Sequence, residues 1–379
     1  MTRCGRVARW RRPELTWCHV AKAVTFLTPA SWSTPAVEGA VVSQRQSLAV
    51  CGLAGASEKA LLFGGNTSRR VAGDWQTSKT LCLVDLPADA GTVNFAQLER
   101  PGQPWPAARW GATLTQTAAG AVLWGGWGRD GRTDQPWILR LREACPEWHE
   151  LQDGNGPATA AFHTATGLPD GKRMAVVGGL GDGSSHDGVW VFDSSREKWE
   201  KLCDGGPAPA GHVAAVDYDA HRLVLCFGVR RQAPWFNGDS FLGTTSVLDL
   251  RMSRWDAAPF PVDLGEMPVS RRNPAGASLG RRLVVSGGYS DEDFASLDDT
   301  WSLDMQSGVW QELPAAGPRL EGHKAVCSGL DIFTFGGHKL VGRFEGPQIS
   351  VHRLAIGQGS AGSSSDSDGS GSESSAVTE

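Results

Sequence analysis

Residues 174–202 read MAVVGGLGDGSSHDGVWVFDSSREKWEKL, and the glycine-rich run within them has two interpretations. A phosphate-binding loop needs G-x-G-x-x-G between a strand and a helix, because the helix N-terminus supplies the amides that hold the anion. Here Gly179, Gly181 and Gly183 are followed by Ser184, where the third glycine is needed. The next run, VWVFD, is β-branched and aromatic, which indicates a strand. The glycines therefore predict a turn between two strands.

The same sequence pattern recurs along the chain. Apolar runs that end in a glycine pair occur as LLFGG, VLWGG, AVVGG, LVVSGG and IFTFGG. A sixth run, LVLCFGV, keeps Gly228 and has Val229 in the second place. Recurrence at a spacing of about 50 to 60 residues indicates one supersecondary unit repeated six times.

Each unit continues with a second apolar run and, in five of the six, with an aromatic residue. The end of that run precedes the aromatic by six positions in four units and by ten in the first. The pairs are Asp193–Trp199, Asp249–Trp255, Asp304–Trp310, Arg142–Trp148 and Asp85–Phe95. Another apolar run precedes each glycine pair, as in FHTATGL and GHKAVCSG. The unit is therefore predicted to hold four short strands, a to d, with the glycine pair after strand b and the aromatic on strand d.

Four strands in about 50 residues are typical of a β-propeller blade. The sequence resembles the kelch-repeat family over residues 14–357. The resemblance lies in the glycine pairs, in the Trp-x-x-Leu segments (WHEL, WEKL, WQEL) and in the spacing between them. The resemblance implies an all-β, six-bladed propeller with four-stranded blades. The outer-strand tryptophans are expected to fill the core, since the sheets splay apart away from the axis. The expected core tryptophans are Trp148, Trp190, Trp199, Trp255, Trp301 and Trp310.

The sixth unit lacks a Trp-x-x-Leu segment, so a strand from elsewhere must cover its exposed edge. The segment ELTWCHV, with Trp17 and Val20, offers this pattern, and residues 14–20 are predicted to supply the closing strand. Residues 1–13 are a basic leader and 358–379 an acidic Ser/Gly-rich tail, both predicted to be disordered. In the tail, Ser363, Ser365 and Ser370 have the acidic residue three positions on that acid-directed kinases favour.

Composition excludes several classes of function. A net charge of −5 disfavours a nucleic-acid or membrane-surface partner. The eight cysteines are scattered and form no C-x-x-C pair, which predicts free thiols in a reducing compartment such as the cytoplasm. The Arg-rich leader leaves nuclear or organellar import open. A monomer is expected, and no segment outside the repeats is predicted to be a catalytic or ligase-recruiting domain.

The chain shows no pattern for catalysis. Kelch-type copper oxidases need tyrosine ligands, and this sequence has only Tyr218 and Tyr289, in different units. The iron-binding run E-x-x-x-D-x-x-x-H is broken at Ala208, and neither G-x-S-x-G nor a sialidase Asp-box occurs. Three histidines begin strand a of units three, four and six, where the repeat itself explains their alignment; they are His163, His212 and His323. The prediction is a protein without enzyme activity, metal or cofactor. The alternative is an enzyme or a small-molecule or metal binder that uses the mouth of the channel.

The predicted function is therefore a scaffold or adaptor that binds a protein or peptide of acidic or mixed charge. The family resemblance implies that the b–c loops and d–a connections at one end of the channel form the binding face. Exposed Trp, Tyr and Arg are the types enriched in binding hot spots, and QAPWFNGDSF (232–241) is the most aromatic loop. An acidic patch is expected at Asp291–Phe294 and Leu297–Asp299. The predicted partner-binding residues are Asn66, Arg109, Trp127, Arg129, Arg230, Arg231, Trp235, Phe236, Tyr289, His338 and Arg343.

Overall fold

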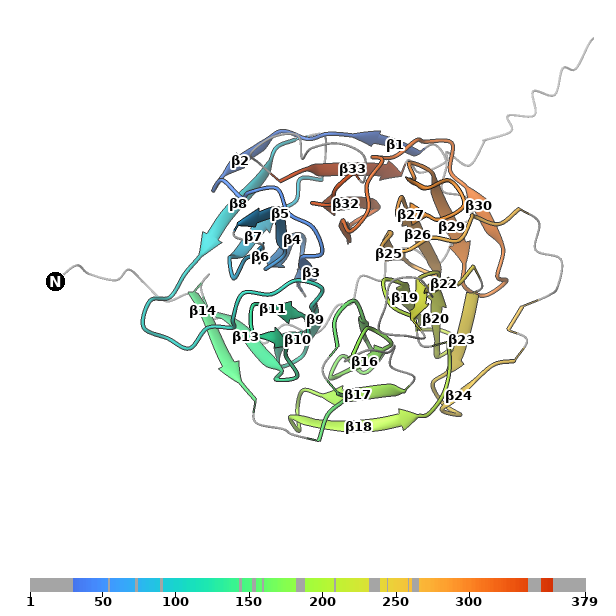
Figure 1. The fold of residues 1–379 in the computed structure, drawn as a ribbon, viewed down its shortest axis with the longest axis horizontal. Helices are drawn as coiled ribbons and strands as arrows, with labels where there is room; N and C mark the ends of the chain where they lie inside the picture. Colours follow the sequence, from blue (N-terminus) through green and yellow to red (C-terminus); the bar gives the residue numbers. More distant parts are fainter. Residues whose placement is uncertain are drawn as a thin grey trace, which may run out of the picture.

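The structure, a computed structural model, is an all-β propeller of six blades of four strands each around a central axis, with a fifth strand added to the sheet of blade one (Figure 1). This confirms the fold class predicted from the repeats. The described residues are 30–53, 55–71, 74–88, 91–142, 145–151, 155–158, 160–181, 188–207, 209–231, 239–243, 245–257, 259–260, 266–339 and 349–356. Among them, no helix is long and apolar enough to cross a membrane.

Within each blade the strands run antiparallel from the innermost, a, to the outermost, d. The first three blades comprise β3 (Ala49–Leu53), β4 (Ala56–Phe63), β7 (Leu81–Asp85) and β8 (Val93–Leu98); β9 (Thr113–Thr117), β10 (Gly120–Trp124), β13 (Trp137–Arg142) and β14 (Cys145–Glu150); and β15 (Thr164–Gly167), β16 (Arg173–Val177), β17 (Val189–Asp193) and β18 (Lys198–Cys203). The last three comprise β19 (Val213–Asp217), β20 (Arg222–Cys226), β23 (Thr245–Asp249) and β24 (Arg254–Trp255); β25 (Ala275–Leu279), β26 (Arg282–Ser286), β29 (Thr300–Asp304) and β30 (Trp310–Glu312); and β31 (Lys324–Ser328), β32 (Asp331–Phe335), β33 (Val351–Ile356) and β1 (Ala30–Ser33).

Four of the described b–c connections carry a short two-stranded ribbon. These ribbons are β5 (Asn66–Val71) with β6 (Asp74–Thr77), β11 (Trp127–Gly128) with β12 (Gly131–Arg132), β21 (Val229–Arg231) with β22 (Asp239–Phe241), and β27 (Tyr289–Ser290) with β28 (Ala295–Ser296). Because strands alternate in direction, the b–c and d–a connections lie at the same end of the propeller.

A closed ring of backbone hydrogen bonds, called here the axial ring, surrounds the axis at that end. Just before strand a, one residue of each blade donates its N–H to the carbonyl of its equivalent in the preceding blade, at 2.7–2.9 Å. All six have a left-handed φ between 49° and 70°. The ring residues are Ser47, Gly111, Phe162, Gly211, Asn273 and Gly322. Every blade is thereby held at a fixed position relative to its neighbours.

The glycine pairs make a second set of contacts between blades. The second glycine donates its N–H to a carbonyl just before the axial ring of the next blade, at 2.8–2.9 Å in all six cases. The first glycine has a positive φ and lies against that same carbonyl. A Cβ at Gly178 would lie 2.0 Å from the Pro209 oxygen. Glycine is needed there both for its conformation and for this close approach.

Blade four shows that the alignment predicted for LVLCFGV was wrong by one residue. Gly228 is the second residue of the pair, since its N–H donates to the Arg271 carbonyl. Phe227 takes the first place, with a φ of 66°. Its ring lies 5.4 Å from that of Trp310, so burial of an aromatic side chain offsets the strained backbone. The residue after the pair is therefore Val229, not Arg230.

The six-residue interval between Asp and Trp corresponds to the c–d hairpin. Asp193 ends strand c, and its Oδ1 accepts the N–H groups of Ser195 and Arg196. Asp249 and Asp304 make the same pair of contacts two and three residues on. The turn places the following aromatic on strand d at the register that directs it toward the neighbouring blade.

Six apolar clusters fill the spaces between adjacent blades, and strand d supplies an aromatic to each. Trp199, for example, packs edge-on against Trp124 of the preceding blade, with centroids 5.4 Å apart. Of the predicted core tryptophans, Trp148, Trp199, Trp301 and Trp310 are buried, whereas Trp190 and Trp255 are half-buried. The propeller therefore has its core between blades rather than at the axis.

An N-terminal strand closes the ring, as predicted, but it is not residues 14–20. Strand β1 pairs antiparallel with β33, with Trp32 opposite Leu354, and Figure 1 shows the two side by side at the rim. Trp32 Nε1 donates to Thr300 Oγ1 of blade five at 3.1 Å. The edge of β33 is thus occupied by a later Trp-containing segment, and residues 14–20 lie outside the described residues. Strand β2 (Val37–Gly39) then pairs in parallel with β8 of blade one. The N-terminal segment therefore pairs with both blade six and blade one, where the ring closes.

Substitution of Gly178 should test the role of the glycine pair. Gly178→Ala places a Cβ against a backbone oxygen, whereas Gly205→Ala, at a similar φ of 73°, meets no atom within 4 Å. We expect Gly205→Ala to lower the free energy of unfolding by about 1 kcal/mol, the left-handed penalty alone. Gly178→Ala should cost at least about 2 kcal/mol more, as an overpacked site does. Equal losses in denaturant titrations would contradict this account of the first glycine.

Two truncations should test the closing strand. Removal of residues 1–29 retains β1, whereas removal of 1–34 also takes away β1 and Trp32. We expect the longer truncation to unfold at a temperature several degrees lower or to aggregate, because it exposes the edge of β33. Differential scanning calorimetry of the two proteins makes the comparison. The same melting temperature for both would exclude β1 as the closing strand.

Candidate partner-binding site at the channel mouth

The mouth of the channel at the b–c end is built on the axial ring. The residue before each ring residue forms an isolated backbone bridge with the residue after the glycine pair of the same blade. The bridged pairs are Gln46–Asn66, Trp110–Trp127, Ala161–Leu180, Ala210–Val229, Arg272–Tyr289 and Glu321–His338. Because the bridges use only backbone atoms, their side chains can differ from blade to blade, and these side chains give the mouth its character.

Blades two and three contribute an aromatic cluster. Trp127 stacks on Trp110, with ring centroids 6.4 Å apart and an angle of 22° between the planes. The Arg132 guanidinium lies 4.6 Å from the centre of the Trp127 ring, and Phe162 meets Trp110 edge-on at 5.1 Å. Trp127 nevertheless remains 40% exposed. This is a large apolar ring held in place by its neighbours but still open to solvent.

Blades five and six contribute a polar cluster. The Glu321 carboxylate is 3% exposed, and it lies 3.0 Å from His338 Nε2 and 3.7 Å from Arg272 Nε. The Arg272 guanidinium lies 4.5 Å from the centre of the Tyr289 ring. Two cationic or potentially cationic groups thus surround one buried carboxylate. The mouth is therefore apolar on one side and charged on the other.

The structure places the predicted binding residues in three groups. Trp127, Arg129 and Arg230 are exposed at this end, and His338 is partly exposed. Asn66, Arg109 and Tyr289 are at most 8% exposed, so they were wrongly predicted as surface contacts. Trp235, Phe236 and Arg343 lie outside the described residues, as do Ser363, Ser365 and Ser370, and the side chain of Arg231 is not described either. The site predictions for these last residues stay predictions.

Arg109 is buried because it belongs to a repeated structural contact. Arg45, Arg109 and Arg271 occupy equivalent places two residues before the axial ring. In each, Nε donates to the carbonyl two residues earlier, and Nη1 donates to the carbonyl of the blade's first glycine at 3.0–3.2 Å. These guanidinium groups tie the d–a connection to the b–c turn. They are therefore occupied inside the fold.

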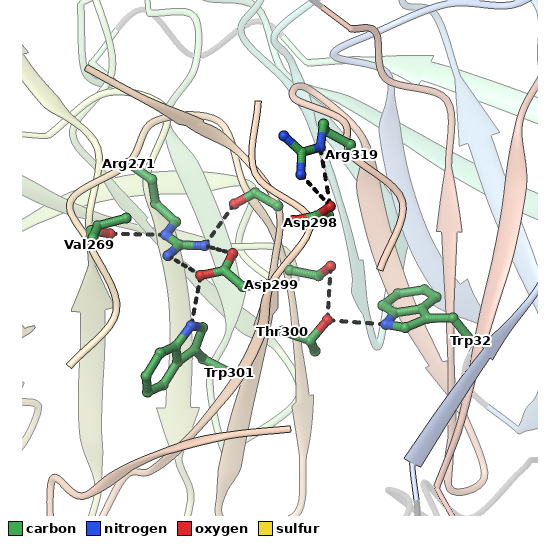
Figure 2. Close-up of polar contacts among 10 residues, drawn as sticks. Trp32, Val269, Arg271, Asp298, Asp299, Thr300, Trp301 and Arg319 are labelled. Atoms are coloured by element: carbon green, nitrogen blue, oxygen red, sulfur yellow. Dashed lines mark hydrogen bonds and ion pairs between the residues drawn. The ribbon is translucent and has the colours of Figure 1, made fainter. Parts of the chain in front are cut away.

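Part of the predicted acidic patch is likewise occupied. Figure 2 shows that Asp299 accepts two hydrogen bonds from Arg271, at 2.6 and 2.7 Å, and one from Trp301 Nε1 at 2.8 Å. Asp298 accepts two from Arg319, at 3.1 and 2.6 Å. These pairs neutralise the loop at 297–299. The exposed acidic residues that remain on this ribbon are at 291–293.

Sequence reasoning missed Trp110, Phe162, Arg272 and Glu321. They lie at or next to the axial ring, in short segments between strand d and strand a that carry no motif of their own. Their common feature is their position, because each precedes the start of strand a by two or three residues. Aligning the six units on that start, rather than on the glycine pair alone, could have found them.

The three aligned histidines are buried and pack against glycines of the preceding blade. His163 Nε2 lies 2.8 Å from Thr113 Oγ1, and His212 Nε2 lies 2.7 Å from Thr164 Oγ1. Burial, with a smaller contribution from Lys324, lowers the pKa of His212 to about 3. Burial and nearby cationic side chains lower that of His323 to about 3. Among the described residues, no group of three potential ligands is arranged to hold a metal ion.

The geometry defines the class of protein as a β-propeller. Side chains from its b–c and d–a connections surround one end of the channel. A family model for the KLHDC2/KLHL20/DRC7 kelch-repeats domain matches residues 21–228 and 146–337. The chain belongs to the kelch-repeat family, as its glycine pairs suggested.

Several proteins are similar to this chain. Putative adagio-like protein 2 of Oryza sativa subsp. japonica is 26% identical over 344 residues, covering 86% of this chain and 52% of that protein. Adagio protein 3 of Arabidopsis thaliana is 23% identical over 338 residues, with the same two coverages. Kelch domain-containing protein 3 of Bos taurus is 28% identical over 194 residues, covering 48% of this chain and 49% of that protein. The chain thus spans about half the length of these relatives.

The buried histidines should make stability fall in mild acid. An unfolded histidine has a pKa near 6.5, whereas His212 and His323 titrate near 3 in the fold, so below about pH 6.5 the unfolded state takes up protons that the folded state does not. At pH 5 each should cost about 2 kcal/mol of unfolding free energy. Urea titrations from pH 7.5 to 5 should show this decline, and it should be much shallower in the variant His212→Gln/His323→Gln. If stability fell as steeply with pH in the variant as in the wild type, the acid sensitivity could not be assigned to these two histidines.

Proposed function

We propose that this protein is a non-enzymatic adaptor that holds a protein or peptide segment of acidic or mixed charge at the channel mouth. The observation that carries the proposal is the exposed indole of Trp127, which is 40% exposed although two neighbouring groups fix its position. Membership of the kelch-repeat family is consistent with it. The adaptor is proposed to act as a monomer in the cytoplasm, without a cofactor. The buried free thiols of Cys51, Cys82 and Cys226 suit a reducing compartment.

The aromatic cluster has the properties of a binding hot spot. Trp127 is held by Trp110 on the ring face and by Arg132, so a ligand would not have to order it on binding. Burial of such a ring under a partner side chain removes apolar surface from water, the largest favourable term in association. Tryptophan and arginine are also the types that carry most binding energy in protein interfaces.

The charges beside this cluster define the partner further. Arg129 and Arg230 are exposed at the same end of the propeller, and Arg132 is half-buried beside Trp127. Guanidinium groups pair best with carboxylates. The exposed acidic residues 291–293 on the blade-five ribbon would meet basic groups of the same partner. A ligand with an apolar anchor next to an acidic residue therefore matches the aromatic side of the mouth.

A displayed random peptide library, selected against the wild-type protein, should test the proposal. The enriched peptide should combine an apolar anchor with an acidic residue, and Trp127→Ala should weaken its binding by at least about 2 kcal/mol, or roughly 30-fold in Kd. The matched control is Met252→Ala, which removes a side chain that is 64% exposed at the c–d end. Isothermal titration calorimetry compares the three proteins.

The fold should survive both substitutions, because neither side chain belongs to an interblade cluster. Two results would contradict the proposal. One is a selected peptide that binds Trp127→Ala as tightly as the wild type, and the other is a loss of binding in Met252→Ala equal to that in Trp127→Ala.

A further inference from the structure

Beneath the axial ring, the channel contains a cavity of about 200 Å³. Its wall comes from the start of strand a in all six blades and consists mainly of Ala, Thr, Val and Leu side chains. Among the described residues that line this wall, Lys324, the first residue of β31, is the only lysine or arginine, and none is a carboxylate. An ammonium group in a wall without a carboxylate calls for a physical explanation.

The repeat places two hydroxyl groups in the same layer as Lys324. Thr113, Thr164 and Lys324 each begin strand a, two residues after the axial ring residue of their blade. Because the blades are related by rotation about the axis, these three positions lie at the same height in the channel. The threonine hydroxyls contact His163 and His212, and the His212 imidazole is neutral because burial lowers its pKa to about 3. The layer therefore holds one ammonium group, with hydrogen-bonding groups from other blades in the same wall.

No carboxylate of the described residues compensates this charge. Burial lowers the pKa of the Lys324 ammonium, and no opposing contribution from an acidic group accompanies it. The Lys324 side chain is half-buried, and an ammonium group partly withdrawn from water is destabilised unless a counter-charge or hydrogen-bond acceptors replace its lost hydration. An anion in the cavity would supply both.

We propose that this layer of the channel binds a small inorganic anion, held by the Lys324 ammonium with Thr113 and Thr164 as neighbouring hydroxyls. The size of the cavity sets the class of ligand, since sites for drug-sized molecules are usually about 300 Å³ or larger. Chloride or phosphate fits this space, whereas a nucleotide does not. The anion lies inside the propeller, so the inference is independent of the partner proposed for the mouth.

Chloride NMR tests the site directly. The probe is sodium chloride with the full chain, and the measurement is the excess ³⁵Cl linewidth caused by the protein. We expect excess broadening in the wild type, its reduction when phosphate is added, and its loss in Lys324→Met. The variant Lys79→Met, which removes an exposed lysine outside the channel, is the control and should broaden chloride as the wild type does.

Broadening in Lys324→Met equal to that in the wild type would overturn the proposal, as would a wild type without excess broadening. If Lys324→Met does not unfold cooperatively, crystals of the wild type soaked in bromide replace it. An anomalous peak beside Lys324 Nζ would then support the site, and a channel without such a peak would overturn it.

Discussion

Six backbone hydrogen bonds that close on themselves around the axis set the geometry of this protein. Each requires a residue in the left-handed conformation, which costs a non-glycine residue roughly 1–2 kcal/mol. Ser47, Phe162 and Asn273 bear that cost. A backbone hydrogen bond contributes a net of about 1 kcal/mol, so the axial ring does not stabilise itself. It positions the blades, while the free energy that holds them comes from the packing between them.

That packing is distributed evenly around the molecule. Each of the six apolar clusters spans two adjacent blades, and each receives an aromatic side chain from an outer strand. Among the described residues these clusters all lie between blades and none lies within one blade, so a blade is stable only between two neighbours. This is why closure matters: without β1, blade six would lose its outer strand and the contact of Trp32 with Thr300. Strand β1 of the N-terminal segment completes blade six, and strand β2 of the same segment pairs with blade one.

The same construction separates stability from recognition. The bridges above the axial ring use backbone atoms alone, so the position before the ring can hold Trp110, Arg272 or Glu321 without change to the fold. Side chains at these places are free to differ, and they converge on one mouth from distant parts of the sequence. The position one residue earlier in the chain is different. Arg109, which occupies it, donates hydrogen bonds to backbone carbonyls and has a structural role. One step along the chain decides between the two roles.

The sequence by itself determined the number of units, the four strands of each and the place of the outer aromatics, because the glycine pairs and the Asp-to-Trp interval reflect local turns. Tertiary structure alone decided the rest. Trp17 and Trp32 both precede the first blade in the chain, and only the pairing of β1 with β33 and the contact with Thr300 identify the segment of Trp32 as the closing strand. Phe227 occupies the place of a glycine, and its ring packs against Trp310 in the apolar cluster between blades four and five. Trp110 and Phe162 meet only when the ring closes, since long-range packing, not local pattern, brings blades two and three together.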